Sequence, residues 1–159
     1  MPGPQRDPER SSILASRKVS WASSEATRRT MQGNRSRDTK PELRIRRILH
    51  AEGLRYRVDM RPVEGFRRRG DIVFGNGKVV VLVHGCFWHG CELHYVPPVA
   101  DADYWAAKVR RNVERDVETV EVLKEHGWLP IVVWEHDDPE MAAASIREMV
   151  SSRRSIRGR

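Results

Sequence analysis

One stretch constrains the fold of this chain more than any other: residues 79–94, VVVLVHGCFWHGCELH. Its first half is an almost unbroken run of valines, which is typical of a strand buried on both faces. Its second half holds both cysteines of the chain, three histidines and a Phe-Trp pair within ten positions of the strand end. An ordinary core strand has no need of such a cluster, so we expect the functional site there.

The residues just before this stretch predict a β-hairpin. Asn-Gly at 76–77 separates two apolar runs, and this dipeptide is the strongest short signal for a two-residue type I′ turn. The turn would pair Ile72 with Val81. Because side chains alternate along strands, Asp71 and His84 then fall on the same face as diagonal neighbours. The turn thereby brings together an acid and an imidazole that lie thirteen positions apart.

The other hydrophobic patterns complete an α/β fold. The predicted helices cover residues 39–52, 103–126 and 138–150, and the further predicted strands lie near 54–60 and 128–136. The core face of the long middle helix is predicted from Val109, Val113, Val117 and Val120. This order describes a mixed β-sheet flanked by helices, with an antiparallel hairpin at its heart.

Length and charge bound the partners of the protein. A chain of 159 residues is of single-domain size; we expect a disordered arm over 1–23, one domain over 24–150 and a basic tail over 151–159. The net charge of +7 favours a polyanion such as nucleic acid, although some basic proteins have no such partner. No apolar run approaches 18 residues and the N-terminus lacks an apolar leader, so we expect a soluble intracellular protein.

Cysteine and histidine spacing predicts a zinc site. Cys86, Cys91 and His94 have the spacing C-x4-C-x2-H, and His136 ends a later strand that would lie beside the hairpin. Thiolate and imidazole suit tetrahedral Zn²⁺, and four such ligands fill the shell of a structural site. The alternative is two buried free thiols with surface histidines. A redox pair is disfavoured because the C-x-x-C spacing is absent.

Asp71, His84 and His89 suit a different chemistry. A carboxylate can hold Mg²⁺, which takes one or two carboxylates together with substrate phosphate, and the backbone carbonyl of Val83 lies within the same segment. Two such ions can stabilise the attacking and leaving oxygens of a phosphodiester. A histidine with a pKa near neutrality can move the proton. A lone aspartate at a strand start is, however, usually structural.

Several further residues admit two interpretations. Phe87 and Trp88 are either a wedge inserted between base pairs or a cover over the zinc. The arginines at 67–69 are either solvated or a phosphate clamp. Glu42, in the segment Thr-Lys-Pro-Glu at 39–42, completes a capping box or joins the site. Asp116 is a surface acid or a site residue.

Six short segments together resemble one known family, the very short patch repair (Vsr) mismatch endonucleases. They are ATRRTM at 26–31, RDTKPE at 37–42, HGCFWH at 84–89, YW at 104–105, NVERD at 112–116 and VWEH at 133–136. The resemblance implies a restriction-endonuclease-like fold and a bacterial cytoplasmic enzyme that acts at the nucleoid. It also implies that the enzyme nicks DNA on the 5′ side of the T in a T:G mismatch, the product of 5-methylcytosine deamination.

The resemblance also implies roles for individual residues. The implied catalytic and Mg²⁺-site residues are Asp71, with the Val83 carbonyl, and His84, His89, Asp116 and Glu42. The implied zinc ligands are Cys86, Cys91, His94 and His136. The implied DNA contacts are the wedge Phe87, Trp88 and Trp105, together with Arg67, Arg68 and Arg69. The partners that the resemblance implies are mismatched duplex DNA and mismatch-repair factors, and we expect a monomer with two Mg²⁺ ions and one structural Zn²⁺.

Two departures from the family pattern matter. Many relatives have proline before the catalytic aspartate, where this chain has Gly70, and glycine there suggests a looser approach to the aspartate. The arginines at 67–69 also differ from the usual lead-in. Two rival functions therefore stay open: a restriction-type or general nicking endonuclease that cuts paired DNA, and a zinc-stabilised DNA-binding module without catalysis.

Overall fold

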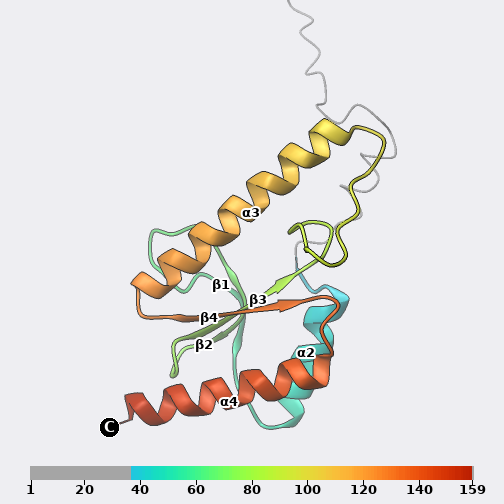
Figure 1. Cartoon of the computed structure of the whole chain (residues 1–159). Helices are drawn as coiled ribbons and strands as arrows, with labels where there is room; N and C mark the ends of the chain where they lie inside the picture. Colours follow the sequence, from blue (N-terminus) through green and yellow to red (C-terminus); the bar gives the residue numbers. More distant parts are fainter. Residues whose placement is uncertain (1–36, 159) are drawn as a thin grey trace, which may run out of the picture. The chain divides into compact units, whose positions relative to one another are not determined.

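A mixed sheet of four strands forms the centre of the computed structural model, which describes residues 37–158. The strands are β1 (Arg57–Met60), β2 (Gly70–Phe74), β3 (Val79–His84) and β4 (Leu129–Trp134), in that spatial order. β1, β2 and β3 pair antiparallel, and β4 pairs parallel with β3 (Figure 1). The predicted mixed sheet with a central hairpin is confirmed. The predicted arm over 1–23 lies outside the described residues.

The register of the hairpin is confirmed, whereas its predicted turn type is wrong. Ile72 pairs with Val81, as the alternation of side chains requires. A type I′ turn needs positive φ at both central residues. Here the positive φ, +49°, lies at Lys78 and not at Asn76 or Gly77. The Lys78 N–H donates to the Gly75 carbonyl at 3.1 Å, so the connection uses residues 75–78 and keeps the predicted pairing.

Helices cover both faces of the sheet (Figure 1). On one face lie α2 (Lys40–Ala51) and α4 (Pro139–Arg157), which bury Ile45, Leu49 and Ile146 against alternate residues of β2 and β3. On the other face lies α3 (Ala102–Glu125), whose Leu123 packs with Val73, Val80 and Leu82. Both faces of β3 are therefore buried, which explains its continuous run of valines.

The predicted core face of α3 is partly wrong. Val113 and Val117 are 39% and 53% exposed. Val109 is buried as predicted. The buried line continues, however, through Trp105, Thr119 and Leu123, and it passes Asn112 and Asp116 at alternating spacings of three and four residues. The inward face of α3 is therefore a mixture of apolar and polar residues. Two of these inward positions, Asn112 and Asp116, serve the site described below.

The last helix is longer than predicted. α4 continues to Arg157, past the expected end near Val150, because no glycine or proline interrupts it before Gly158. Its second half is also held in place: the Arg153 guanidinium donates to the carbonyls of Gly77 and Gly127. In residues 37–158 we find no helix whose length and apolarity would let it cross a membrane.

Candidate active site and metal centre

The pairing of β3 with β4 positions the whole site. These strands are parallel, with His84 opposite Trp134, so the segments that follow the two strands leave the sheet at the same edge. The segment 85–94 and the turn 135–137 therefore lie side by side, and α3 runs beside the segment 85–94 (Figure 1). Residues separated by about fifty positions in sequence meet at this edge.

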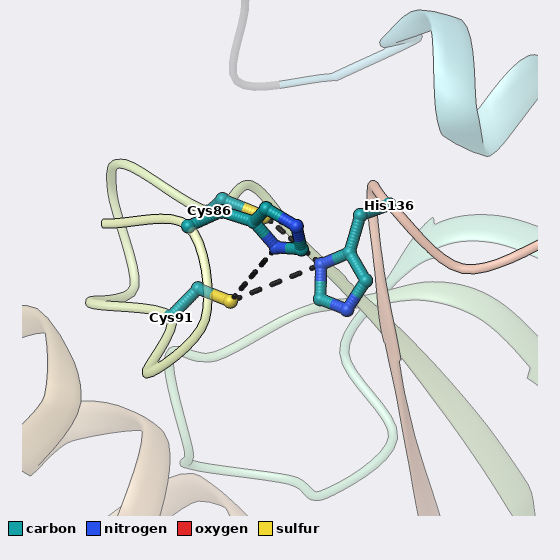
Figure 2. Close-up of side chains that lie close together, drawn as sticks. Cys86, Cys91 and His136 are labelled. Atoms are coloured by element: carbon teal, nitrogen blue, oxygen red, sulfur yellow. Dashed lines mark hydrogen bonds between the residues drawn. The ribbon is translucent and has the colours of Figure 1, made fainter. Parts of the chain in front are cut away.

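Four predicted zinc ligands come together at this edge. The donor atoms of Cys86, Cys91, His94 and His136 all lie within 4.8 Å of one another. The Cys86 Sγ is 3.1 Å from His136 Nδ1, and the Cys91 Sγ is 3.7 Å from His94 Nδ1 and 3.8 Å from His136 Nδ1. Figure 2 shows Cys86, Cys91 and His136 turned toward one another. Both thiols are buried and free, so two sulfur and two nitrogen donors form a set suited to tetrahedral Zn²⁺.

The two thiols have different environments. Burial raises the pKa of the Cys86 thiol to about 11, and the neighbouring Cys91 and Glu135 add to that rise. Burial also acts to raise the pKa of Cys91, but hydrogen bonds from His94 and from the backbone outweigh it and the net shift is downward. Thiolates, not thiols, bind metal, so occupancy of this set requires proton release from Cys86.

A second cluster joins two histidines to an acid of α3. The His89 Nδ1 lies 2.6 Å from Asp116 Oδ2, and the His84 Nε2 lies 3.9 Å from Asp116 Oδ1. Asp116 thus faces inward, and the neighbouring Arg115 bonds to Asn112 instead of to this acid. The pKa of His84 is lowered to about 4, mainly by burial and also by the charge of His89, while Asp116 opposes both. His84 is therefore neutral at physiological pH.

Asp71 begins β2 next to this cluster but is not a member of it. Its Oδ2 accepts a hydrogen bond from the Val83 N–H at 2.6 Å, across the hairpin. The pKa of Asp71 is raised to about 7, mainly by burial and also by the charge of Glu42, against the opposing hydrogen bond from the Val83 N–H. A half-buried carboxylate beside a second acid is an unfavourable arrangement that a bound cation would relieve.

Glu42 shows features of both interpretations. Its carboxylate accepts hydrogen bonds from the Thr39 hydroxyl at 2.8 Å and from the Asp38 N–H at 3.0 Å, and Arg46 lies 3.2 Å away. These are contacts of a helix start, although Thr39 makes no side-chain cap bond of its own. Glu42 is only 3% exposed, and its charge acts on Asp71. The helix start and the acid site are thus adjacent.

Gly70 has a packing reason that its sequence context did not reveal. A Cβ at this position would lie 2.5 Å from Cγ1 of Val80 and 2.8 Å from Cγ2 of Val73. The backbone before Asp71 is therefore tightly packed on its neighbours. The looser approach expected of glycine is not what this position provides.

The aromatic residues form one cluster. Ring centroids lie 5.1 Å apart for Phe87 and Trp88, 5.2 Å for Phe87 and Trp105, and 5.8 Å for Trp88 and Trp105. Trp105 is 4% exposed, whereas Phe87 and Trp88 are half-buried. Two contributors were not predicted: Tyr95, whose ring contacts Phe87, and Asn112, whose amide donates to the Trp88 carbonyl at 2.8 Å.

The three consecutive arginines do not form one patch of uncommitted charge. Arg69 bonds to the carbonyl and the carboxylate of Asp59, and Arg68 lies 3.7 Å from a Glu118 oxygen. Arg67 is exposed. Two of the predicted phosphate contacts therefore have acidic neighbours within the protein.

Comparison with known proteins gives consistent matches. The family model of the DNA mismatch endonuclease Vsr matches residues 22–94. The chain is 43% identical over 120 residues to the type II nicking enzyme V.NaeI of Lentzea aerocolonigenes, covering 74% of this chain and 72% of that protein. It is 37% identical to the type II nicking enzyme V.XorIIP of Xanthomonas oryzae pv. oryzae, covering 79% and 90%. It is 38% identical to the DNA mismatch endonuclease Vsr of Escherichia coli K12, covering 69% and 70%.

Proposed function

Because the chain belongs to the family of the DNA mismatch endonuclease Vsr and is a DNA nicking endonuclease of that family, we propose that it hydrolyses one strand of duplex DNA with Asp71 holding Mg²⁺ and His89 moving the proton. The observation that carries this proposal is the 2.6 Å pair of His89 and Asp116 beside neutral His84. The fold of the chain is of the restriction-endonuclease-like class, which agrees with the expected architecture.

The residues around Asp71 fit a divalent cation bound through oxygen. The carboxylate is half-buried, and the charge of Glu42 acts on it. Carboxylate and carbonyl oxygens are the ligands that hard cations prefer, so Asp71 and the Val83 carbonyl would hold the ion. When bound, Mg²⁺ supplies positive charge that stabilises the phosphate oxygens. The second Mg²⁺ stays a prediction.

His89 is oriented for proton transfer by its acid partner. A carboxylate at Nδ1 fixes the tautomer with the proton on that nitrogen, so Nε2 keeps a lone pair that can accept a proton from water. His84, held neutral by burial, can donate or accept a hydrogen bond at the phosphate without adding a buried charge. Asp116 then stabilises the imidazolium that His89 becomes.

The Cys/His centre is proposed as a structural zinc site. The donor set of Cys86, Cys91, His94 and His136 fits Zn²⁺ by ligand type and by number. Four protein ligands leave no open position, so the ion, when bound, fixes the loop that carries His89 and the aromatic cluster. The residues of that loop, and not the zinc, would contact DNA.

The comparisons favour nicking as such over any one target. Two of the relatives described above are named as nicking enzymes and one as a mismatch endonuclease. A second candidate function, recognition of a T:G mismatch, is supported by Phe87 and Trp88, the half-buried members of the aromatic cluster, since large apolar side chains can wedge apart a weakened base step. Repair of deaminated 5-methylcytosine would follow from that target.

A nicking assay separates these targets. Labelled duplexes with a single T:G pair, and matched duplexes with T:A or C:G at that position, are incubated with zinc-loaded protein with and without added Mg²⁺. Omitting Mg²⁺ is preferable to adding EDTA, which would also remove zinc. Asp71→Ala is compared with Glu92→Ala as the matched control, since Glu92 is an exposed acid of the metal loop, the segment 85–94 that carries three of the proposed zinc ligands.

The outcomes are distinct. Mg²⁺-dependent nicking of one strand, lost in Asp71→Ala and kept in Glu92→Ala, supports the proposed chemistry. A nick confined to the 5′ side of the T in T:G supports mismatch recognition, whereas equal nicking of all three duplexes supports a general or restriction-type enzyme. Tight DNA binding by folded, zinc-loaded wild type without any nick, across several flanking sequences, contradicts the proposed activity.

A further inference from the structure

We propose that Glu135 and Asp137 are positioning residues of the Cys/His centre, each of which holds one metal ligand from outside the coordination shell. This inference rests on the metal centre proposed above. It assigns a role to the two acids that flank His136. Neither acid supplies a donor atom to the cluster.

Glu135 holds the Cys86 ligand through the backbone. Its Oε1 accepts a hydrogen bond from the Cys86 N–H at 2.6 Å, although 49 positions separate the two residues. Its own N–H donates to the His84 carbonyl at 2.9 Å, which extends the β3–β4 pairing by one residue. Hydrogen bonds to a carboxylate are stronger than neutral ones. Glu135 therefore fastens the start of the metal loop to the end of β4.

The chain between these contacts has little room. A Cβ at Gly85 would lie 3.4 Å from the Trp88 ring and 3.8 Å from Oε2 of Glu135. The Glu135 carboxylate thus sits over the backbone where the chain turns from the strand into the metal loop. The Glu135 contact therefore adds a restraint on Cys86 from outside the loop, beside the hydrogen bond that the Cys91 N–H donates to the Cys86 carbonyl at 3.0 Å within it.

Asp137 faces the histidine ligand on its far side. The His136 Nδ1 faces the Cys86 Sγ, while its Nε2 lies 3.5 Å from Oδ1 of Asp137. The Asp137 carboxylate is itself fixed, because its Oδ2 accepts the Trp134 N–H at 2.8 Å. A carboxylate behind a metal-bound imidazole sets the tautomer and orients the ring. Asp137 therefore favours a proton on Nε2 and leaves Nδ1 as the ligand atom.

The test measures metal affinity directly. Co²⁺ is titrated into metal-free protein against a competing chelator, and binding is followed by the thiolate-to-cobalt charge-transfer absorption. Four variants are compared with wild type: Glu135→Ala, Glu135→Gln, Asp137→Ala and the control Glu92→Ala. Loss of an outer-shell partner typically weakens metal binding by about 10- to 100-fold, and we expect losses in this range for the first and third variants.

The conservative variant separates positioning from charge. Glu135→Gln keeps an oxygen that accepts the Cys86 N–H and removes a charge that opposes the Cys86 thiolate, so its affinity should fall no more than roughly 3-fold below that of wild type, a change of about 0.7 kcal/mol. Glu92→Ala should bind Co²⁺ as wild type does, because Glu92 is exposed and lies on the same loop. Equal losses in Glu135→Gln and Glu135→Ala would contradict the hydrogen-bonding role.

Thermal unfolding with and without metal excludes a purely structural role. Positioning predicts that Glu135→Ala and Asp137→Ala lower the Tm of the loaded protein more than that of the metal-free protein. Equal lowering in both states, or unchanged Co²⁺ affinity in both alanine variants, overturns the inference. If wild type itself gives no charge-transfer band, the proposed metal centre is contradicted. Failure of the present inference looks different, because wild type then binds Co²⁺ and both alanine variants bind it equally well.

Discussion

The imidazole rings of His84 and His89 stack face to face, with centroids 4.0 Å apart and 5° between their planes. Two positive charges at this separation would repel strongly, so the charge of His89 adds to burial in keeping His84 neutral. Asp116 contacts His89 at 2.6 Å and His84 only at 3.9 Å. The stack therefore sets the acid-bound His89 against a His84 that carries no charge near neutral pH.

The first prediction concerns Asp116. Asp116→Asn keeps the size of the side chain but removes the charge that stabilises protonated His89, so the single-turnover nicking rate should fall about 100-fold or more. DNA affinity and unfolding free energy should change little, because Asp116 is partly exposed. Glu114→Gln, an exposed neighbour on α3, is the control. A nicking rate within a factor of three of wild type would contradict the assigned role.

The second prediction is a pH dependence of stability. The folded-state pKa of His84 is about 4, below its ordinary value of 6.5. Its stabilising contribution is therefore complete above pH 6.5 and is lost as the pH falls from 6.5 toward 4, by up to about 3 kcal/mol. The comparison is urea unfolding of wild type and His84→Gln at pH 7, 5.5 and 4.5.

Only the difference between these two curves reports His84. Asp71, whose pKa is raised to about 7, acts in the opposite direction over the same range, and acid would also release zinc from the proposed site in both proteins. Both effects cancel in the difference between wild type and variant. Parallel pH profiles for the two proteins would show that His84 is not held neutral.

The third prediction separates the tryptophans. Trp105 is 4% exposed at the centre of the aromatic cluster, so Trp105→Ala should cost about 3–5 kcal/mol in unfolding free energy. Trp88 is half-buried, and its contact with Asn112 uses the backbone carbonyl, so Trp88→Ala should cost less than about 1.5 kcal/mol. Chemical unfolding measures both. If Trp88 is part of a wedge, its variant also loses preference for T:G over T:A in the nicking assay.

The fourth prediction concerns the backbone before Asp71. Gly70→Ala places a Cβ 2.5 Å from Val80, and overpacking of this kind should destabilise the protein by about 1–3 kcal/mol. Val80→Ala removes the contacting methyl groups. The double variant should therefore be more stable than the sum of the two single effects predicts, as a double-mutant cycle of unfolding free energies would measure. Strict additivity would exclude the contact.

Sequence patterns predicted the parts of this fold that depend on local periodicity. The hairpin register followed from the alternation of side chains around residues 76–77, even though the turn itself differs, because both turns satisfy the same pairing. The inward face of α3 did not follow. Its line of valines and its line through Trp105 and Asp116 are both periodic, and only the sheet and loops that α3 covers decide between them.

The site shows the same division. Ligand and acid residues could be chosen from their chemistry and from short motifs. The contacts that support these residues could not be predicted. Asn112 and Glu135 bond to the backbones of Trp88 and Cys86, and a backbone group is the same whatever the side chain, so no sequence pattern marks it. Asn112 lies in the family motif NVERD and Glu135 in the motif VWEH. Motif residues without an assigned chemical role were therefore the sequence feature that could have pointed to these supporting contacts.

The pairing of Cys86 with His136 has a consequence for the unfolded chain. A metal bound by both residues closes a loop of about fifty positions that contains all of α3 and β4. A cross-link of that span lowers the entropy of the unfolded state by an amount worth about 4 kcal/mol, on the model used for disulfides. The ion would then act as a reversible cross-link in a chain that has no disulfide within its described residues. Zinc supply, and not only temperature, would set how long the folded enzyme persists.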